Sequence, residues 1–254
     1  MALVDHKTEM QFCNALHGKK FSDLEPNELK GFVTFLNDNK QPDNDCIIQC
    51  YGRTKNVPSS DQHRADFPCT RRQTMRPKRD SVVIINECSK CGFGVEKKVS
   101  LKSGDANSDH QEYWKYFSKL LENLGADKKE IDAFSDLVHS RDLEYFKKHT
   151  NEKKLMQDFL DSNKEELITH FLKTGYCSEE GHAEYLFHGN KDDILSDCVF
   201  ASTDFMIKKI MSIPPGKIAD LYLGAFTLQR WNVTTGGKLD SIQCKMGKFR
   251  KYMN

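Results

Sequence analysis

The chain has 254 residues, of which 30% are charged and 38% are hydrophobic, and its formal net charge is +1. A chain of this length can bury a substantial core as one large domain. No apolar run approaches the roughly 18 residues that a membrane span needs, and the N-terminal residues lack the apolar segment of a signal peptide. We therefore expect a soluble, cytoplasmic protein with no membrane association.

The small net charge conceals a separation of charge along the chain. Residues 53–102 hold 12 lysines and arginines against 5 acidic residues, and residues 206–254 hold 9 against 2. Residues 105–204 hold 12 against 22. Two basic segments beside an acidic one are typical of a protein that turns its basic regions toward a polyanion.

The first half of the chain combines helical and strand patterns. Apolar residues recur at helical spacing over residues 8–16 and 26–36. Residues 81–85 and 95–101 are rich in β-branched side chains and are separated by a segment with two glycines, which predicts a β-hairpin.

The second half begins with apolar stripes at helical spacing, typical of core-facing helices. Near the end, runs at 220–229 and 239–246 flank Thr234-Thr235-Gly236-Gly237 and predict a second hairpin with a basic tail. We expect one domain of 254 residues in four parts. These are an N-terminal helical part (1–52), a catalytic core (53–125), an acidic helical region (126–204) and a C-terminal β-hairpin (205–254).

Side-chain alternation constrains the first hairpin. Glu96, Lys98, Ser100 and Lys102 project from one side of their strand. The numbers of opposing residues in an antiparallel pair have a constant sum, so a turn centred near Lys90 places Asp80 opposite Ser100, with Lys98 and Lys102 flanking it. A turn centred two residues earlier places Glu96 opposite Asp80 instead, with Lys98 as the catalytic amine.

These residues resemble the active site of the PD-(D/E)XK nuclease superfamily, in which an Asp is followed by an acidic residue, any residue and a Lys. Asp80 with Glu96-Lys97-Lys98 fits that short motif. A longer resemblance favours the other register. Pro77-Lys78-Arg79-Asp80, Ser100-Leu101-Lys102-Ser103 and Glu112-Tyr113 are similar to the layout of short, monomeric type II restriction endonucleases that recognise four base pairs.

Two further stretches are similar to the same enzymes. One begins at Leu155-Met156-Gln157-Asp158 and extends to Ala183-Glu184-Tyr185, and the other is the terminal hairpin around Thr227-Leu228-Gln229-Arg230 and Ile242-Gln243-Cys244-Lys245. The resemblance implies an α/β (α+β) restriction-endonuclease-like core, with a central mixed β-sheet flanked by helices and a helical insertion. It also implies a monomer, although dimers are common among restriction enzymes.

Phosphodiester hydrolysis explains why these residue types would be needed. Mg²⁺ prefers oxygen ligands and keeps several waters, so one or two carboxylates and a phosphate oxygen suffice. We expect Asp80 to be the central ligand of one or two Mg²⁺ ions, the Leu101 carbonyl a second ligand, and Lys102 the group that orients or deprotonates water. Ser100 is a poor Mg²⁺ ligand, so Glu96 or Glu112, expected on the following helix, would supplement it.

The terminal hairpin is expected to contact double-stranded DNA. Arginine suits bidentate contacts with guanine and glutamine with adenine, whereas other basic residues would contact phosphates and position the protein. The candidates for these contacts are Gln229, Arg230, Lys238, Gln243, Lys245, Lys248 and Arg250.

The nine cysteines are an odd number at irregular spacing, which argues against a secreted disulfide scaffold. Cys88-x-x-Cys91 resembles half of a zinc site, and either Cys46 with Cys50 or His63 with Cys69 could complete four ligands for a structural Zn²⁺. Reduced cysteines that pack or remain exposed are the alternative, which we favour.

The sequence therefore predicts a Mg²⁺-dependent, sequence-specific endonuclease of double-stranded DNA, a type II restriction enzyme. One alternative is a non-catalytic, zinc-stabilised nucleic-acid-binding protein in which the Asp80 hairpin is structural. A repair or defence nuclease of the same superfamily, without restriction-type specificity, lies between the two.

Overall fold

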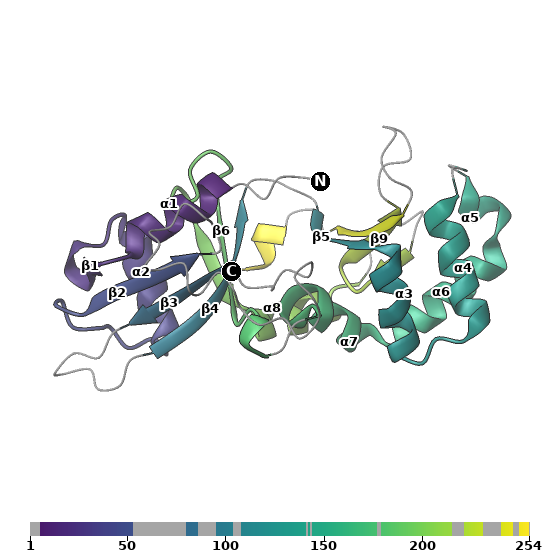
Figure 1. The fold of residues 1–254 in the computed structure, drawn as a ribbon, viewed down its shortest axis with the longest axis horizontal. Helices are drawn as coiled ribbons and strands as arrows, with labels where there is room; N and C mark the ends of the chain where they lie inside the picture. The colour runs from purple at the N-terminus through teal and green to yellow at the C-terminus, as the bar shows by residue number, and fades with distance from the viewer. Residues whose placement is uncertain are drawn as a thin grey trace. The chain divides into compact units, whose positions relative to one another are not determined.

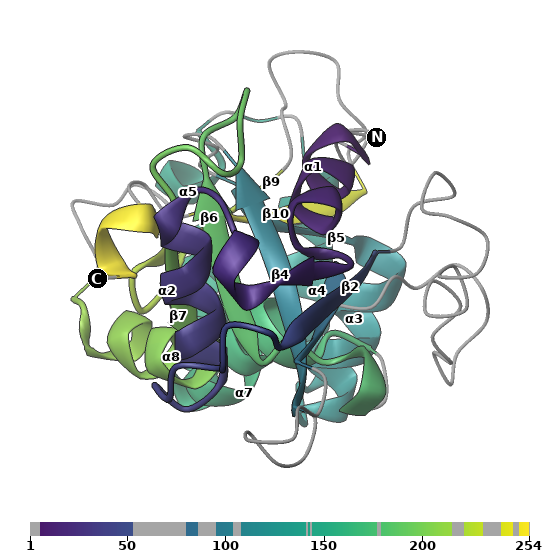
Figure 2. The ribbon, with the colours of Figure 1, turned by 90° about the vertical axis from the view of Figure 1, so that its left-hand side faces the viewer.

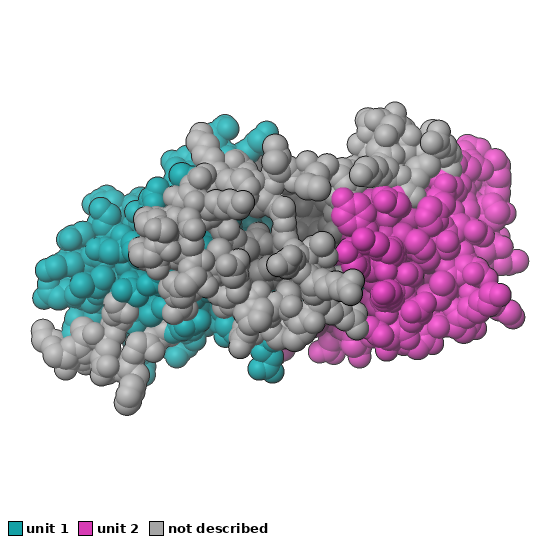
Figure 3. Space-filling view, viewed as in Figure 1, with its two compact units in different colours: residues 1–105, 173–206, 250–254 teal, residues 106–172, 207–249 magenta. Residues whose placement is uncertain are grey.

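The computed structural model describes residues 6–52, 80–85, 95–103, 108–140, 142, 144–176, 179–214, 221–230, 240–245 and 249–253. The chain divides into two compact units that interleave in sequence, coloured separately in Figure 3. Unit 1 comprises residues 1–105, 173–206 and 250–254, and unit 2 comprises residues 106–172 and 207–249. The acidic region 126–204 contributes to both units, and the predicted single domain in four parts stays a prediction.

Unit 1 is built on a six-stranded mixed sheet. The strand order is β1-β2-β3-β4-β6-β7. Every neighbouring pair is antiparallel except β4 and β6, which run parallel. The strands are β1 (Lys19–Lys20), β2 (Ile47–Gly52), β3 (Ser81–Ile85), β4 (Val95–Ser103), β6 (Tyr185–Gly189) and β7 (Val199–Ser202).

Two helices, α1 (His6–Leu16) and α2 (Asn27–Leu36), cover one face of this sheet, as Figures 1 and 2 show. Both were predicted from apolar periodicity, and α2 buries Leu29, Phe32, Val33 and Leu36, which lie on one helical face. The Phe187 ring of β6 makes edge-to-face contacts with Phe12 of α1 and Phe32 of α2, each with ring centroids 4.9 Å apart. Residues 1–52, which were predicted as a helical part, also supply strands β1 and β2 to the sheet.

Unit 2 combines a four-stranded antiparallel sheet with a group of helices. The strand order is β5-β10-β9-β8. The strands are β5 (Ser108–Tyr113), β8 (Leu221–Leu223), β9 (Phe226–Arg230) and β10 (Ser241–Lys245). The helices are α3 (Trp114–Asn123), α4 (Lys128–His139), α5 (Tyr145–Lys148), α6 (Thr150–Ser162) and α7 (Lys164–Thr169). Helix α8 (Thr203–Ser212) begins in unit 1 and ends in unit 2.

Two local expectations in unit 2 were wrong. Residues 220–229 do not form one strand: the chain turns at Gly224, whose φ of +60° favours glycine, and β8 pairs back onto β9. A side chain at Gly224 would also place a Cβ 2.5 Å from the Ile210 carbonyl oxygen. Glu112 lies on strand β5 rather than on a helix, because residues 108–113 pair with β10.

The second hairpin is confirmed by the antiparallel pairing of β9 with β10, although its turn lies outside the described residues. None of the described helices combines the length and apolarity needed to cross a membrane.

Candidate active site

The candidate active site is built on the pairing of β3 with β4. Ser81 lies opposite Val99, and the register continues to Ile85 opposite Val95. Extending it by one residue places Asp80 opposite Ser100, the arrangement expected for a turn centred near Lys90. The alternative register does not occur, because Glu96 lies opposite Ile84.

Two hydrogen bonds fix the Asp80 carboxylate against β4. Its Oδ2 accepts a bond of 2.9 Å from the Ser100 hydroxyl and one of 2.8 Å from the backbone N–H of Leu101. The backbone N–H of Asp80 in turn donates to the carbonyl of Val99 at 2.8 Å. Main-chain and side-chain bonds thus hold the aspartate at the first position before β3, with its carboxylate over the middle of β4.

The two faces of β4 separate core residues from site residues. Val99 is buried and Leu101 partly buried in the core formed with α1 and α2. Ser100 and Lys102 alternate with them and therefore project from the opposite face. The candidate carboxylate, hydroxyl and amine thus share the side of the sheet that α1 and α2 do not cover.

The parallel neighbour β6 adds a residue that the sequence pattern did not reveal. His188 lies opposite Lys102, and Leu186 lies opposite Ser100. Neighbouring side chains on one face of a sheet lie about 5 Å apart at Cβ, which places the buried His188 beside the lysine. No local signal could have identified it, because the β4–β6 pairing joins segments far apart in sequence.

Lys98 and Glu96 lie further along the same face. Lys98 Nζ donates to the Glu179 carbonyl oxygen at 2.9 Å, and the Lys98 N–H donates to Glu184 Oε2 at 2.9 Å. Lys98 lines a cavity of about 380 Å³ in unit 1. The other lining residues are Lys173, Glu179, His182, Glu184, Tyr185, Ser202 and Asp204. Glu96 is exposed and remote from the Asp80–Ser100 pair in register.

The donor set around Asp80 suits Mg²⁺ in kind. It offers one carboxylate and, at Leu101, a backbone carbonyl on the edge of β4 that faces Asp80, because the N–H and C=O of one strand residue point to the same neighbour. Mg²⁺ takes such oxygens and completes its shell with water. Among the described residues, no group of three or more His, Cys, Asp or Glu side chains could hold a metal ion.

Glu112, expected to supplement the metal site, belongs to unit 2 and has another contact there. Its Oε2 lies 3.6 Å from His170 Nε2, and both side chains are buried. Glu112 also lies opposite Ile242 of β10, on the side of this sheet that packs on the helices. The Glu112 carboxylate thus has a partner within unit 2, and its part in the metal site stays a prediction.

The sheet of unit 2 sorts the predicted DNA-contacting residues onto two faces. Gln243 lies opposite Gln229, and Lys245 opposite Thr227, so both glutamines and Lys245 share one face. Arg230 lies opposite Ile242 and therefore projects from the other face, toward the helices. Gln243 is buried, whereas Gln229 and Lys245 are half-buried. Lys238 and Lys248 lie outside the described residues.

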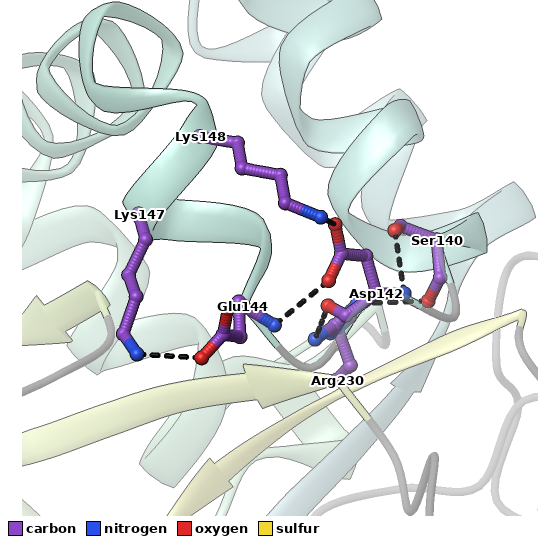
Figure 4. A network of polar contacts seen from close by, with 6 residues as sticks. All are labelled: Ser140, Asp142, Glu144, Lys147, Lys148 and Arg230. Atoms are coloured by element: carbon purple, nitrogen blue, oxygen red, sulfur yellow. Dashed lines mark hydrogen bonds and ion pairs between the residues drawn. The ribbon is translucent and has the colours of Figure 1, made fainter.

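Arg230 holds the chain between α4 and α5, as Figure 4 shows. Its guanidinium donates to the carbonyl oxygens of Ser140 and Asp142, both at 2.8 Å, and lies over the Tyr145 ring. The Asp142 carboxylate accepts bonds from Lys148 Nζ at 2.7 Å and from the Glu144 N–H at 2.9 Å. Both bonds lower the pKa of Asp142, with the Lys148 ammonium the larger cause. The arginine is therefore engaged within unit 2.

The remaining predicted residues have contacts in unit 1. Arg250 makes an ion pair with Asp197, with 2.7 Å between nitrogen and oxygen. Cys46 and Cys50 are fully buried in the apolar core, and the Cys50 thiol donates to Cys13 Sγ. The other predicted zinc ligands, Cys88 and Cys91 with His63 and Cys69 as the alternative second pair, lie outside the described residues. The zinc site therefore stays a prediction.

No protein-family model and no curated protein matches the sequence. Among solved structures, the chain is similar to restriction endonuclease MspI, in a crystal structure of that enzyme in complex with its cognate DNA. The match covers 86% of this chain and 77% of that chain, with 12% sequence identity and a TM-score of 0.57. The predicted fold class is thereby confirmed: this is a mixed α/β fold similar to that of a restriction endonuclease, with a six-stranded mixed sheet flanked by helices.

Proposed function

We propose that the protein is a Mg²⁺-dependent, sequence-specific endonuclease of double-stranded DNA, of the type II restriction class. The observation that carries the proposal is the Asp80 carboxylate, bonded to Ser100 and Leu101 on β4, the strand that also carries Lys102. The fold similarity to restriction endonuclease MspI supports a nuclease with this arrangement. PD-(D/E)XK chemistry needs these residue types at neighbouring strand positions.

Asp80 would hold the metal, with the Leu101 carbonyl as a second oxygen ligand. Mg²⁺ bound there would supply positive charge for the phosphoryl oxygen and acidify a coordinated water. Ser100 orients the aspartate by donating its hydroxyl hydrogen to Oδ2. Lys102 would accept a proton from the attacking water or orient it, and its ammonium form would hold the phosphate. Glu96 and Lys98 take no direct part in this assignment.

Base recognition is proposed for the face of the terminal sheet that carries Gln229, Gln243 and Lys245. A glutamine side chain can pair with the N6 and N7 atoms of adenine. The register places Gln229 beside Gln243. The half-buried Gln229 would present its amide to a groove, whereas the buried Gln243 would have to become exposed first. Lys238 and Lys248 would contact phosphates, as would Arg250 after release from Asp197. We propose double-stranded DNA as the partner of a cytoplasmic monomer that recognises four base pairs.

Plasmid cleavage tests this proposal. The wild-type protein is incubated with supercoiled plasmids of known sequence in Mg²⁺ or in EDTA, and DNA binding is measured in parallel by a mobility shift in Ca²⁺. We expect discrete, Mg²⁺-dependent fragments that share one short sequence at their ends.

Asp80→Asn keeps the shape of the side chain and removes its charge, so we expect cleavage to fall below detection while binding persists. Asp43→Asn, on the loop before β2, is the matched control and should cut normally. Binding without cleavage by the wild-type protein would instead support the non-catalytic alternative, and cleavage at random sites would support a repair or defence nuclease.

A further inference from the structure

Two buried thiols meet between α1 and β2, on the face of the unit 1 sheet opposite the candidate active site. Cys13 lies on α1 and Cys50 on β2, and their Sγ atoms are 3.5 Å apart. Their exposed fractions are 2% and 0%. The two residues are 37 positions apart in sequence, so the fold itself brings the thiols together.

The surrounding packing holds α1 close to β2 at this point. A Cβ built on Gly52 would lie 2.8 Å from Glu9 Oε1 and 3.1 Å from Cys13 Sγ. Only a residue without a side chain leaves room for both groups. Glu9 and Cys13 are four positions apart and therefore lie on the same face of α1. Helix α1 thus lies close against β2 at Cys13.

The two sulfurs lie within hydrogen-bond distance of each other but differ in their surroundings. Burial raises the pKa of the Cys50 thiol, and the neighbouring Cys13 thiol raises it further. Cys13 keeps the larger exposed fraction of the two, so a small peroxide would reach Cys13 first.

We propose that Cys13 and Cys50 form an intramolecular disulfide when the protein meets a small peroxide, which makes this pair an oxidation-sensitive link between α1 and β2. The Sγ atoms must approach by about 1.5 Å to reach the length of an S–S bond. The first step oxidises Cys13: its sulfur attacks hydrogen peroxide, the O–O bond breaks, and a sulfenic acid and one water form.

In the second step Cys50 Sγ attacks the Cys13 sulfenic sulfur. The S–O bond breaks, the S–S bond forms, and the Cys50 hydrogen leaves with the hydroxyl group as a second water. The two thiols thus lose two electrons and two protons, and one peroxide is reduced to two waters. Intracellular disulfides of this kind are usually transient redox sensors. This cross-link would form whether or not the protein cleaves DNA.

Peptide mapping of the full chain tests this link. The reduced protein is treated with hydrogen peroxide, quenched with N-ethylmaleimide in urea, and digested without reductant. We expect a Cys13–Cys50 cross-linked peptide that dithiothreitol removes, and a higher Tm for the oxidised protein. When peroxide is added to the protein unfolded in urea, we expect a mixture of disulfides between different cysteines and no preference for Cys13–Cys50.

Cys46→Ser is the matched control, because Cys46 is equally buried in the same core, and this variant should still form the cross-link. Cys13→Ala and Cys50→Ala should lose both the cross-link and the increase in Tm. The wild-type map decides the question even where these variants fold poorly. Maleimide on both Cys13 and Cys50 after peroxide treatment, or pairing of either with another cysteine, would overturn the proposal.

Discussion

The Ser100 hydroxyl donates a 2.9 Å hydrogen bond to the Asp80 carboxylate across the β3–β4 pair. A serine at this position supplies no negative charge, in contrast to the acidic residue of the short nuclease motif. It instead fixes the direction of the Asp80 carboxylate. Within the described part of the chain, the proposed site therefore depends on the orientation of this carboxylate more than on the number of carboxylates.

Removal of that hydroxyl gives the first prediction. Ser100→Ala leaves Asp80 with the Leu101 N–H as its bond from β4, and loss of a hydrogen bond to a charged group costs on the order of 1.5–3 kcal/mol. We expect kcat to fall at least about tenfold and the Mg²⁺ concentration for half-maximal cleavage to rise. Ser100→Thr keeps the hydroxyl and should restore most of the activity. Equal loss in both variants would indicate a packing effect.

A comparison of Lys102 with Lys98 tests which of the two lysines is the catalytic amine. Lys102→Ala should reduce cleavage by a factor on the order of 10² to 10⁴, the usual contribution of a proton-transferring group. Lys98→Ala removes a side chain whose Nζ donates to the Glu179 carbonyl, so cleavage should change by only a few-fold. Single-turnover rates would distinguish the two. Full activity in Lys102→Ala would exclude this lysine as the catalytic amine.

Arg230 gives a prediction about stability rather than base recognition. Arg230→Ala leaves the Ser140 and Asp142 carbonyls without this donor, and we expect about 2–3 kcal/mol of destabilisation in urea unfolding. Arg230→Lys should recover only part of the lost stability, because a lysine ammonium lacks the planar, forked donors of a guanidinium. Gln229→Ala, on the other face of β9, should weaken DNA binding with stability almost unchanged. An altered cleavage sequence in Arg230→Ala, with normal stability, would favour base contact.

The Asp142–Lys148 contact should respond to pH at both extremes. The pKa of Asp142 is lowered, so its contribution to folding stability is complete above the unfolded value of about 3.9 and is lost as the pH falls through the lowered folded value. The pKa of Lys148 is raised, so its contribution is complete below about 10.4 and is lost as the pH rises through the raised folded value.

The free energies of unfolding of the wild type and of Asp142→Asn should therefore differ by a constant amount between about pH 5 and pH 9. The difference should shrink as the pH falls through the lowered folded pKa of Asp142, where the wild-type carboxylate also becomes protonated. A difference that stays undiminished across the acid range would mean that the asparagine acts through packing rather than charge.

The parts of the fold that the sequence predicted are the local ones. Apolar periodicity located α1 and α2, and the constant sum of opposing residues located Asp80 opposite Ser100, because a hairpin is determined by its own strands and turn. The position of Glu112 was missed because the polar residues of β5 become a strand only through pairing with β10. His188 was missed because β6 reaches β4 from more than 80 residues away.

Arg230 shows a different limit of sequence reasoning. An arginine beside a glutamine on a basic hairpin fits DNA chemistry, and no nearby residue indicates another partner. Its carbonyl acceptors lie about 90 positions earlier in the chain. Whether a guanidinium faces solvent or the molecule's own backbone depends on which face of β9 packs on the helices.

The ladder between β3 and β4 also determines which insertions the protein could tolerate. The chain from 86 to 94 connects the two strands, so added residues there would leave the paired positions unchanged. One residue inserted within β4, between Val95 and Ser100, would instead exchange the faces of every later side chain or force a bulge. Lys102 would then point into the core that α1 and α2 cover, and Leu101 toward the face that carries Ser100. We therefore expect single-residue insertions across residues 86–103 to change sharply in their effect on folding at the start of β4.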